Sequence, residues 1–120
     1  GLVGSEMCIR DSRDTYLDYN HTKIPLEKAY DFSPFPKGMD RKYKPLLLGS
    51  GCQMWSEWIP RIEDMQRQVF PRIAAYAESG WTIENKKNFT RFSTSLSQIL
   101  IPRWKQKNIA WHKESTPQAE

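Results

Sequence analysis

The sequence predicts an α/β fold built from parallel βαβ units, and three observations lead to this prediction. Two short segments rich in strand-forming residues, 15–19 and 46–54, alternate with segments of helical periodicity, which favours a parallel sheet. The second segment runs into Trp55-Ser56-Glu57 just before a helix, the place where an α/β barrel presents functional groups. Two strands cannot form a stable sheet alone. We therefore expect an incomplete slice of a larger α/β domain.

The first half of the chain is expected to hold two strands and one short helix. The first strand covers 15–19, where β-forming residues alternate. A helix follows over 25–30, because its leading proline suits a first helical turn. The second strand covers 46–54, an apolar run in which Gly49 and Gly51 permit close approach of neighbouring backbone.

The second half is expected to be helical. Apolar residues recur at helical spacing over 62–81. Pro71 lies inside this pattern, so it should kink the helix or start a new one at Phe70. A second amphipathic helix is predicted over 89–100, and Pro102 should end it or bend it.

Composition limits the chain to one small domain. It has 120 residues, a hydrophobic fraction of 38% and a mean hydropathy of −0.73. No apolar run approaches the ~20 residues that a membrane span needs. The formal charge is +4, and basic residues crowd around the last two tryptophans: Arg103, Lys105, Lys107 and Lys113. Such interleaving is compatible with nucleic-acid binding, but a solvated helix end explains it better, so no nucleic-acid partner is expected.

The two ends of the chain are not expected to belong to the packed fold. Residues 1–12 read as one translated frame of a DNA adapter from transposase-based sequencing libraries, so they are expected to be a scar without a packing role. Cys8 belongs to that segment, which leaves Cys52 alone and excludes a disulfide. Cys52 is interpreted as a small core residue. Residues 112–120 are predicted to be a disordered tail.

The other aromatic residues and charges have plain structural interpretations. The four tryptophans outside the Trp55-Ser56-Glu57 stretch are interpreted as packing residues: Trp58, Trp81, Trp104 and Trp111. Arg72 and Glu78 are interpreted as an ion pair on the side of the long helix.

Several short pieces, in order and spacing, carry a resemblance to a known family. They are Tyr16-Leu17-Asp18-Tyr19, the run 24–30, the stretch 48–57, and Phe70-Pro71-Arg72 followed by Ala77-Glu78 and Trp81. Together they resemble the C-terminal part of the catalytic barrel of family 20 glycoside hydrolases, the β-N-acetylhexosaminidases. The resemblance implies that residues 13–111 hold strands 7 and 8 of a (β/α)₈ TIM barrel, with its last helices.

The resemblance also implies an activity. Such enzymes are retaining exo-hydrolases that remove terminal N-acetylglucosamine or N-acetylgalactosamine, with the substrate's own acetamide oxygen as nucleophile. It implies that the Asp-Glu pair that moves protons lies upstream, outside this chain. No cofactor and no metal ligands are expected. A secreted, periplasmic or lysosomal location is implied, and the sequence itself leaves the compartment open.

Four residues receive roles by this resemblance. Tyr16 matches the tyrosine that stabilises the acetamide oxygen, and Asp18 matches a carboxylate that binds sugar hydroxyls. Trp55 matches the wall of the pocket for the terminal sugar, and Glu57 matches a second hydroxyl-binding carboxylate. The expected partners are therefore glycans that end in an N-acetylhexosamine. The alternative is a non-catalytic carbohydrate-binding module, in which Trp55, Trp58 and the carboxylates hold a sugar without chemistry.

Overall fold

The computed structural model describes residues 15–35, 38, 40–47 and 49–113, so the predicted adapter segment 1–12 and residues 114–120 of the predicted tail lie outside it. The described part is mainly helical. Its elements are α2 (Leu26–Tyr30), the 3₁₀ helix η2 (Arg41–Leu46), α3 (Ile62–Val69), α4 (Arg72–Trp81), the 3₁₀ helix η3 (Glu84–Lys86), α5 (Phe89–Ser95), the π-helix η4 (Leu96–Leu100) and α6 (Ile101–Gln106).

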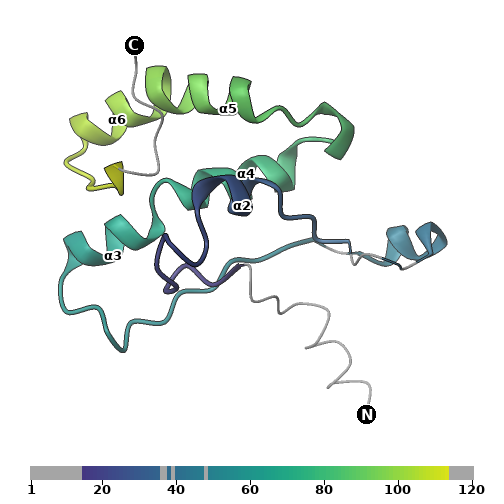
Figure 1. Ribbon diagram of the computed structural model, residues 1–120, viewed down its shortest axis with the longest axis horizontal. Coiled ribbons are helices and arrows are strands. Elements are labelled where there is room, and N and C mark those ends of the chain that lie inside the picture. The colour runs from purple at the N-terminus through teal and green to yellow at the C-terminus, as the bar shows by residue number, and fades with distance from the viewer. Residues whose placement is uncertain (1–14, 36–37, 39, 48, 114–120) are drawn as a thin grey trace.

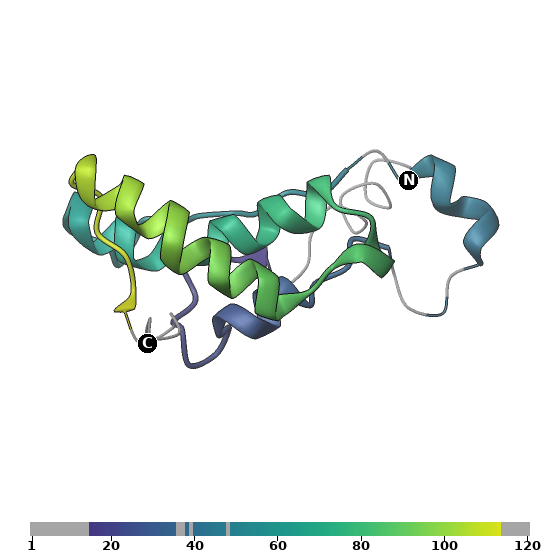
Figure 2. The same ribbon diagram turned by 90° about the horizontal axis from the view of Figure 1, so that it is seen from above.

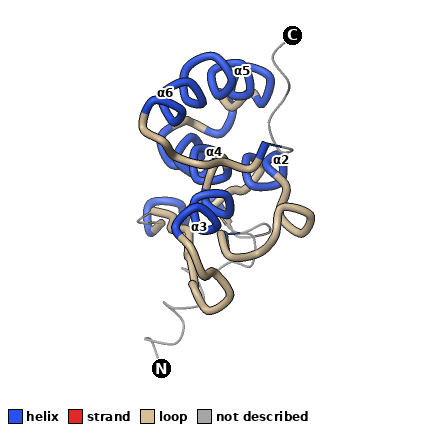
Figure 3. Tube along the Cα trace, turned by 90° about the vertical axis from the view of Figure 1, so that its left-hand side faces the viewer, coloured by secondary structure: helices blue, strands red, loops and turns tan. Residues whose placement is uncertain are grey.

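The helices are stacked in layers. Helices α5 and α6 form one layer, α4 and α2 lie beneath it, and α3 follows α4 further down (Figures 1 and 3). The 3₁₀ helix η2 stands away from this stack in both views of the ribbon (Figures 1 and 2). None of the helices in the described ranges combines the length and apolar character needed to cross a membrane.

The predicted break in the long helix is confirmed. Helix α3 ends at Val69 and α4 begins at Arg72. Pro71 has no N–H to continue the helical bonds, and it forces the preceding residue toward extended backbone. Phe70 accordingly has ψ 136°. The second helix therefore begins two residues later than Phe70.

The last helical stretch continues past Pro102 and ends at Gln106, because a π turn absorbs the proline. In an α-helix the proline ring collides with the carbonyl four residues earlier, and the proline cannot donate a hydrogen bond. Residues Leu96–Leu100 form a wider π turn instead, in which Ile101 N–H donates to Leu96 O. Pro102 then occupies the first turn of α6, where a missing N–H costs little.

The two predicted strands are wrong within the described residues. A single parallel β-bridge joins Tyr16 to Gln53, and Leu46 ends a 3₁₀ helix with 73% of its surface exposed. Extended segments need neighbours on their edges to form ladders, and one bridge is all that two such segments achieve here. Close approach at Gly49 is also absent, since a Cβ there would meet nothing within 4 Å.

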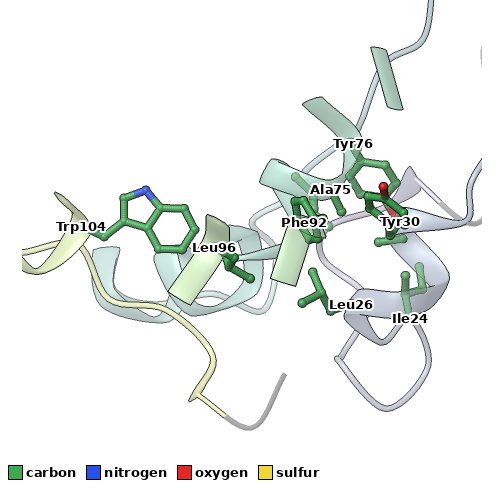
Figure 4. Close-up of a cluster of buried hydrophobic side chains, with 10 residues drawn as sticks. Ile24, Leu26, Tyr30, Ala75, Tyr76, Phe92, Leu96 and Trp104 are labelled. Atoms are coloured by element: carbon green, nitrogen blue, oxygen red, sulfur yellow. The ribbon is translucent and has the colours of Figure 1, made fainter. Parts of the chain in front are cut away.

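The core lies between α2, α4 and the α5–α6 layer. Figure 4 shows Tyr30 of α2 next to Ala75 and Tyr76 of α4, with Phe92 of α5 nearby. The Tyr30 and Phe92 rings lie 4.8 Å apart. Burial of such apolar surface is the main stabilising contribution. The core is thus mainly helical, and Leu17, next to the predicted site residues Tyr16 and Asp18, adds to it from a non-helical segment.

The four tryptophans interpreted as packing residues divide into two pairs. Trp104 is 8% exposed and belongs to the core, and Trp111 packs against it, which confirms the interpretation for this pair. Trp58 and Trp81 are 91% and 92% exposed, so the interpretation is wrong for them in this structure. Large apolar rings that face water favour covering by other protein.

We expect the purified 120-residue chain to be marginally stable. It has one β-bridge among the described residues, and large apolar side chains such as Trp58, Ile62 and Trp81 are exposed. Open strand edges and apolar patches promote association. Thermal denaturation followed by circular dichroism and light scattering should show a broad transition with aggregation. A sharp, reversible transition of a monomer would contradict the prediction.

Candidate functional site

The two segments that carry the predicted site residues are paired in parallel. Leu17 N–H donates to Gln53 O at 2.7 Å, and Gln53 N–H donates to Thr15 O at 3.0 Å. The Thr15 hydroxyl also bonds to the Gln53 amide oxygen at 2.7 Å, and Thr15 is almost fully buried. These three bonds fix the register, with Tyr16 opposite Gln53.

This register places Tyr16 beside Gln53, and the chain then turns, with Tyr19 N–H donating to Tyr16 O at 3.3 Å. Asp18 follows Tyr16 by two positions, Trp55 follows Gln53 by two, and Glu57 follows by four. Parallel segments present their carboxyl ends on the same side. Trp55 is 58% exposed and Glu57 is exposed. That the carboxylates of Asp18 and Glu57 converge on one ligand stays a prediction.

Tyr16 and Asp18 are half-buried beside the bridge. The Tyr16 ring lies 5.4 Å from the Tyr19 ring. Asp18 Oδ1 is enclosed and has no hydrogen-bond partner among the described residues. A buried carboxylate oxygen without a donor is costly, so a compensating positive charge is expected nearby.

Arg72 supplies that charge from the first position of α4. Its side chain is fully buried. Nη2 donates to Leu17 O at 2.5 Å and Nη1 donates to Ile24 O at 3.3 Å, while Nε donates to Gln68 O at 3.1 Å. Burial lowers the pKa of the Arg72 guanidinium, and the charges of Tyr76 and Asp18 act in the opposite direction. The predicted Arg72–Glu78 pair is wrong, because the guanidinium points into the protein.

A groove of about 850 Å³ lies beside the loop that leads from Asp18 to α2. It is lined by residues of the loop before α2, of the Trp58–Pro60 stretch and of α3. At its wall the rings of His21 and His112 are stacked, with centroids 3.7 Å apart and an interplanar angle of 8°. His21 Nε2 lies 2.6 Å from Arg67 O, a separation at which the nitrogen carries the proton. His112 N–H donates to Phe70 O at 3.0 Å, so this residue, predicted as the start of a disordered tail, is bonded to the α3–α4 junction.

The remaining candidate residues have structural roles. Cys52 is partly buried against the core, and burial raises the pKa of its thiol, in line with a core residue rather than a reactive one. Trp104 is buried and cannot stack on a nucleic-acid base. Within the described ranges, no group of three or more His, Cys, Asp or Glu side chains is arranged to hold a metal ion.

Comparison with known proteins decides the family. Residues 7–84 match the family described as Glycosyl hydrolase family 20, catalytic domain. The chain belongs to glycosyl hydrolase family 20. It is 32% identical over 77 residues to a β-hexosaminidase of Porphyromonas gingivalis and 37% identical over 86 residues to β-hexosaminidase 3 of Arabidopsis thaliana. It is 40% identical over 76 residues to β-hexosaminidase subunit B2 of Dictyostelium discoideum.

The family 20 chain is much shorter than these relatives. The matches cover 64%, 70% and 62% of this chain but only 10%, 16% and 13% of the respective relatives. It is therefore homologous to a small part of a β-hexosaminidase catalytic domain, and the glycosidase activity of the relatives belongs to their much longer chains.

Solved structures agree with this placement. An inactive mutant of a family 20 exo-β-N-acetylglucosaminidase from Vibrio harveyi superposes with a TM-score of 0.73 at 25% identity, covering 87% of this chain and 18% of that one. The Vibrio harveyi enzyme in complex with N-acetylglucosamine gives a TM-score of 0.74 at 23% identity, covering 94% and 21%. The backbone of this family 20 segment thus superposes on one part of the Vibrio harveyi enzyme.

Sequence reasoning missed two features of this family 20 segment. Arg72 lies three and four residues before Ala75 and Tyr76, on the buried face of α4. A charged residue within an apolar helical stripe was the available signal. The stacking of His21 on His112 could not be predicted from the sequence. It depends on the path of the chain after α6, which brings His112 into hydrogen-bonding contact with Phe70.

We expect His21 to make the fold less stable in mild acid. Burial, the nearby Arg72 charge and His112 lower the pKa of His21 to about 4, although its bond to Arg67 O acts in the opposite direction. The unfolded chain has a histidine pKa near ~6.5, so it binds the proton more readily than the folded chain. The stabilising contribution is complete above about pH 6.5 and is lost as the pH falls toward 4.

The test measures the thermal unfolding midpoint of the full-length polypeptide at a series of pH values from 7 to 4.5. His21→Gln keeps an N–H donor for Arg67 O and removes the titrating group, so its midpoint should fall less over this range. Parallel curves for the two proteins would mean that His21 does not titrate with unfolding.

Proposed function

We propose that this segment forms the sugar-binding wall of a retaining exo-β-N-acetylhexosaminidase that releases terminal N-acetylglucosamine or N-acetylgalactosamine by substrate-assisted catalysis. The observation that carries the proposal is the parallel register of Tyr16 with Gln53. Because this bridge is parallel, we expect two sequence-distant groups, Tyr16 with Asp18 and Trp55 with Glu57, to lie at the carboxyl ends of neighbouring segments. Functional groups of α/β barrels gather at that end.

Each residue type suits its proposed part. The Tyr16 hydroxyl donates a hydrogen bond to the acetamide oxygen as this oxygen attacks the anomeric carbon. Asp18 and Glu57 accept bonds from sugar hydroxyls, and such bonds are strengthened by the carboxylate charge. The exposed Trp55 ring covers the apolar C–H face of the sugar. The proton donor for the leaving oxygen belongs to the upstream part of the enzyme.

The full-length polypeptide should hydrolyse a chromogenic N-acetyl-β-glucosaminide and leave the corresponding β-glucoside intact. The acetamide is the nucleophile in the proposed route, so its removal eliminates the reaction. Equal turnover of both substrates would exclude substrate-assisted catalysis. The separate 120-residue chain should be inactive.

Asp18→Asn and Glu57→Gln should each raise KM about 10- to 100-fold in the full-length enzyme, because a hydrogen bond to a charged group contributes about 1.5–3 kcal/mol. Glu63→Gln is the matched control, since Glu63 is an exposed carboxylate in the first turn of α3. It should leave KM unchanged. If Asp18→Asn and Glu57→Gln behave like the control, the two carboxylates do not touch the sugar.

A sugar-binding module without chemistry is the second candidate, and the exposure of both Trp55 and Trp58 favours it. Two exposed rings flanking the Glu57 carboxylate can hold a glycan by stacking. This candidate requires that the full-length polypeptide bind N-acetylglucosamine and release nothing from the glycoside.

A further inference from the structure

Arg72 joins the two ends of the loop that carries Asp18. The loop leaves the paired segment after Leu17 and reaches α2 after Ile24, and the guanidinium donates to the carbonyls of both residues. The bonds of Nε and Nη2 to Gln68 O tie the same group to the end of α3. One planar cation thus connects the loop to the α3–α4 junction. A guanidinium suits this task because its five N–H donors have fixed directions.

The positive charge of Arg72 is not neutralised by the groups that accept its hydrogen bonds. Among the described residues, the acceptors that bond to it are neutral: the carbonyls of Leu17, Ile24 and Gln68, and the Gln68 side-chain amide. A buried cation is costly without a counter-charge. Asp18 is the carboxylate that attracts Arg72, and its Oδ1 is enclosed without a hydrogen-bond donor among the described residues. The Arg72 cation and the Asp18 carboxylate therefore attract each other.

We propose that Arg72 is a positioning residue for sugar recognition, which clamps the loop 18–24 by its two ends and holds the Asp18 carboxylate aimed at the sugar. This inference rests on the proposed function for the role of Asp18, and on the geometry of the clamp for the role of Arg72. Arg72 itself does not touch the substrate. Its effect on binding passes through Asp18.

The test uses the full-length enzyme with Arg72→Lys, which keeps the charge and the fold but cannot reach both carbonyls with a fixed fork. We expect KM for an N-acetylglucosaminide to rise about 10-fold, with kcat changed less than about threefold. Arg72→Gln, which also removes the charge, should raise KM further. Arg61→Lys is the matched control, because Arg61 is exposed and pairs with Asp64 at 3.1 Å, and it should change neither constant.

A double-mutant comparison separates positioning from general loosening. In an Asp18→Asn background, Arg72→Lys should raise KM less than about twofold, because the carboxylate through which it acts is gone. If Arg72→Lys still raises KM about 10-fold in that background, Arg72 does not act through Asp18 and the proposal is overturned.

Hydrogen exchange makes the clamp testable apart from the activity. Amides of residues 18–24 should exchange faster in Arg72→Lys than in the wild type, while α5 stays unchanged. Equal exchange in this loop would overturn the clamp whatever the kinetics show. A wild type without hydrolase activity would instead overturn the proposed function, and the exchange result would still decide whether Arg72 holds the loop.

Discussion

Tyr16→Phe is expected to lower kcat of the full-length enzyme about 10²- to 10³-fold on an N-acetylglucosaminide, with a smaller change in KM. Losing one donor that stabilises developing charge typically has an effect of this size. The proposed acceptor is the acetamide oxygen, whose charge changes as it attacks the anomeric carbon. The bond is therefore stronger in the transition state than in the ground state.

The substitution removes only the hydroxyl, because phenylalanine keeps the ring that lies 5.4 Å from Tyr19. Tyr19→Phe is the matched control. Tyr19 is a partly buried tyrosine three residues away whose ring is covered by Lys23 Nζ at 4.3 Å, and its loss of a hydroxyl should leave kcat within about twofold. Steady-state kinetics of the three proteins decide the matter. A Tyr16→Phe enzyme with wild-type kcat and weaker binding would make Tyr16 a lining residue only.

The helices were the part of the fold that sequence predicted best, for a physical reason. The breaks at Pro71 and the short helix after Pro25 follow from local backbone chemistry. The strand over 46–54 depended instead on neighbours, and in this structure one bridge at Gln53 is all that forms. Even so, that bridge has the parallel sense that βαβ alternation predicts.

The candidate site divides in the same way. Tyr16, Asp18, Trp55 and Glu57 were predicted from family motifs, and their convergence on one sugar stays a prediction, while the register sets Tyr16 beside Gln53. Arg72 was misinterpreted because helical periodicity alone does not say whether a charge on an apolar stripe has partners. Besides Gln68, its partners are the carbonyls of Leu17 and Ile24, about fifty residues earlier, and only the folded chain brings them together.

Trp104→Ala is expected to destabilise the fold by about 3–5 kcal/mol, the usual result of removing a buried large aromatic side chain. Trp104 is 8% exposed, and its ring meets Phe70 edge-to-face with centroids 4.8 Å apart at 62°. It is thus the contact through which α6 holds the α3–α4 junction. Its carbonyl also accepts from Ile109 N–H at 2.9 Å, at the point where the chain turns back after α6.

Denaturant unfolding of the full-length polypeptide measures this effect, with Trp104→Phe as the graded variant and Lys105→Ala as the control on the exposed side of α6. Trp104→Phe keeps an aromatic ring and should cost less, and Lys105→Ala should stay within about 0.5 kcal/mol. Phe70 precedes Pro71 and Arg72, so loosening its contact with Trp104 should also increase hydrogen exchange at the start of α4. An Ala variant as stable as the Lys105→Ala control would mean that the upstream barrel, rather than α6, holds the α3–α4 junction in place.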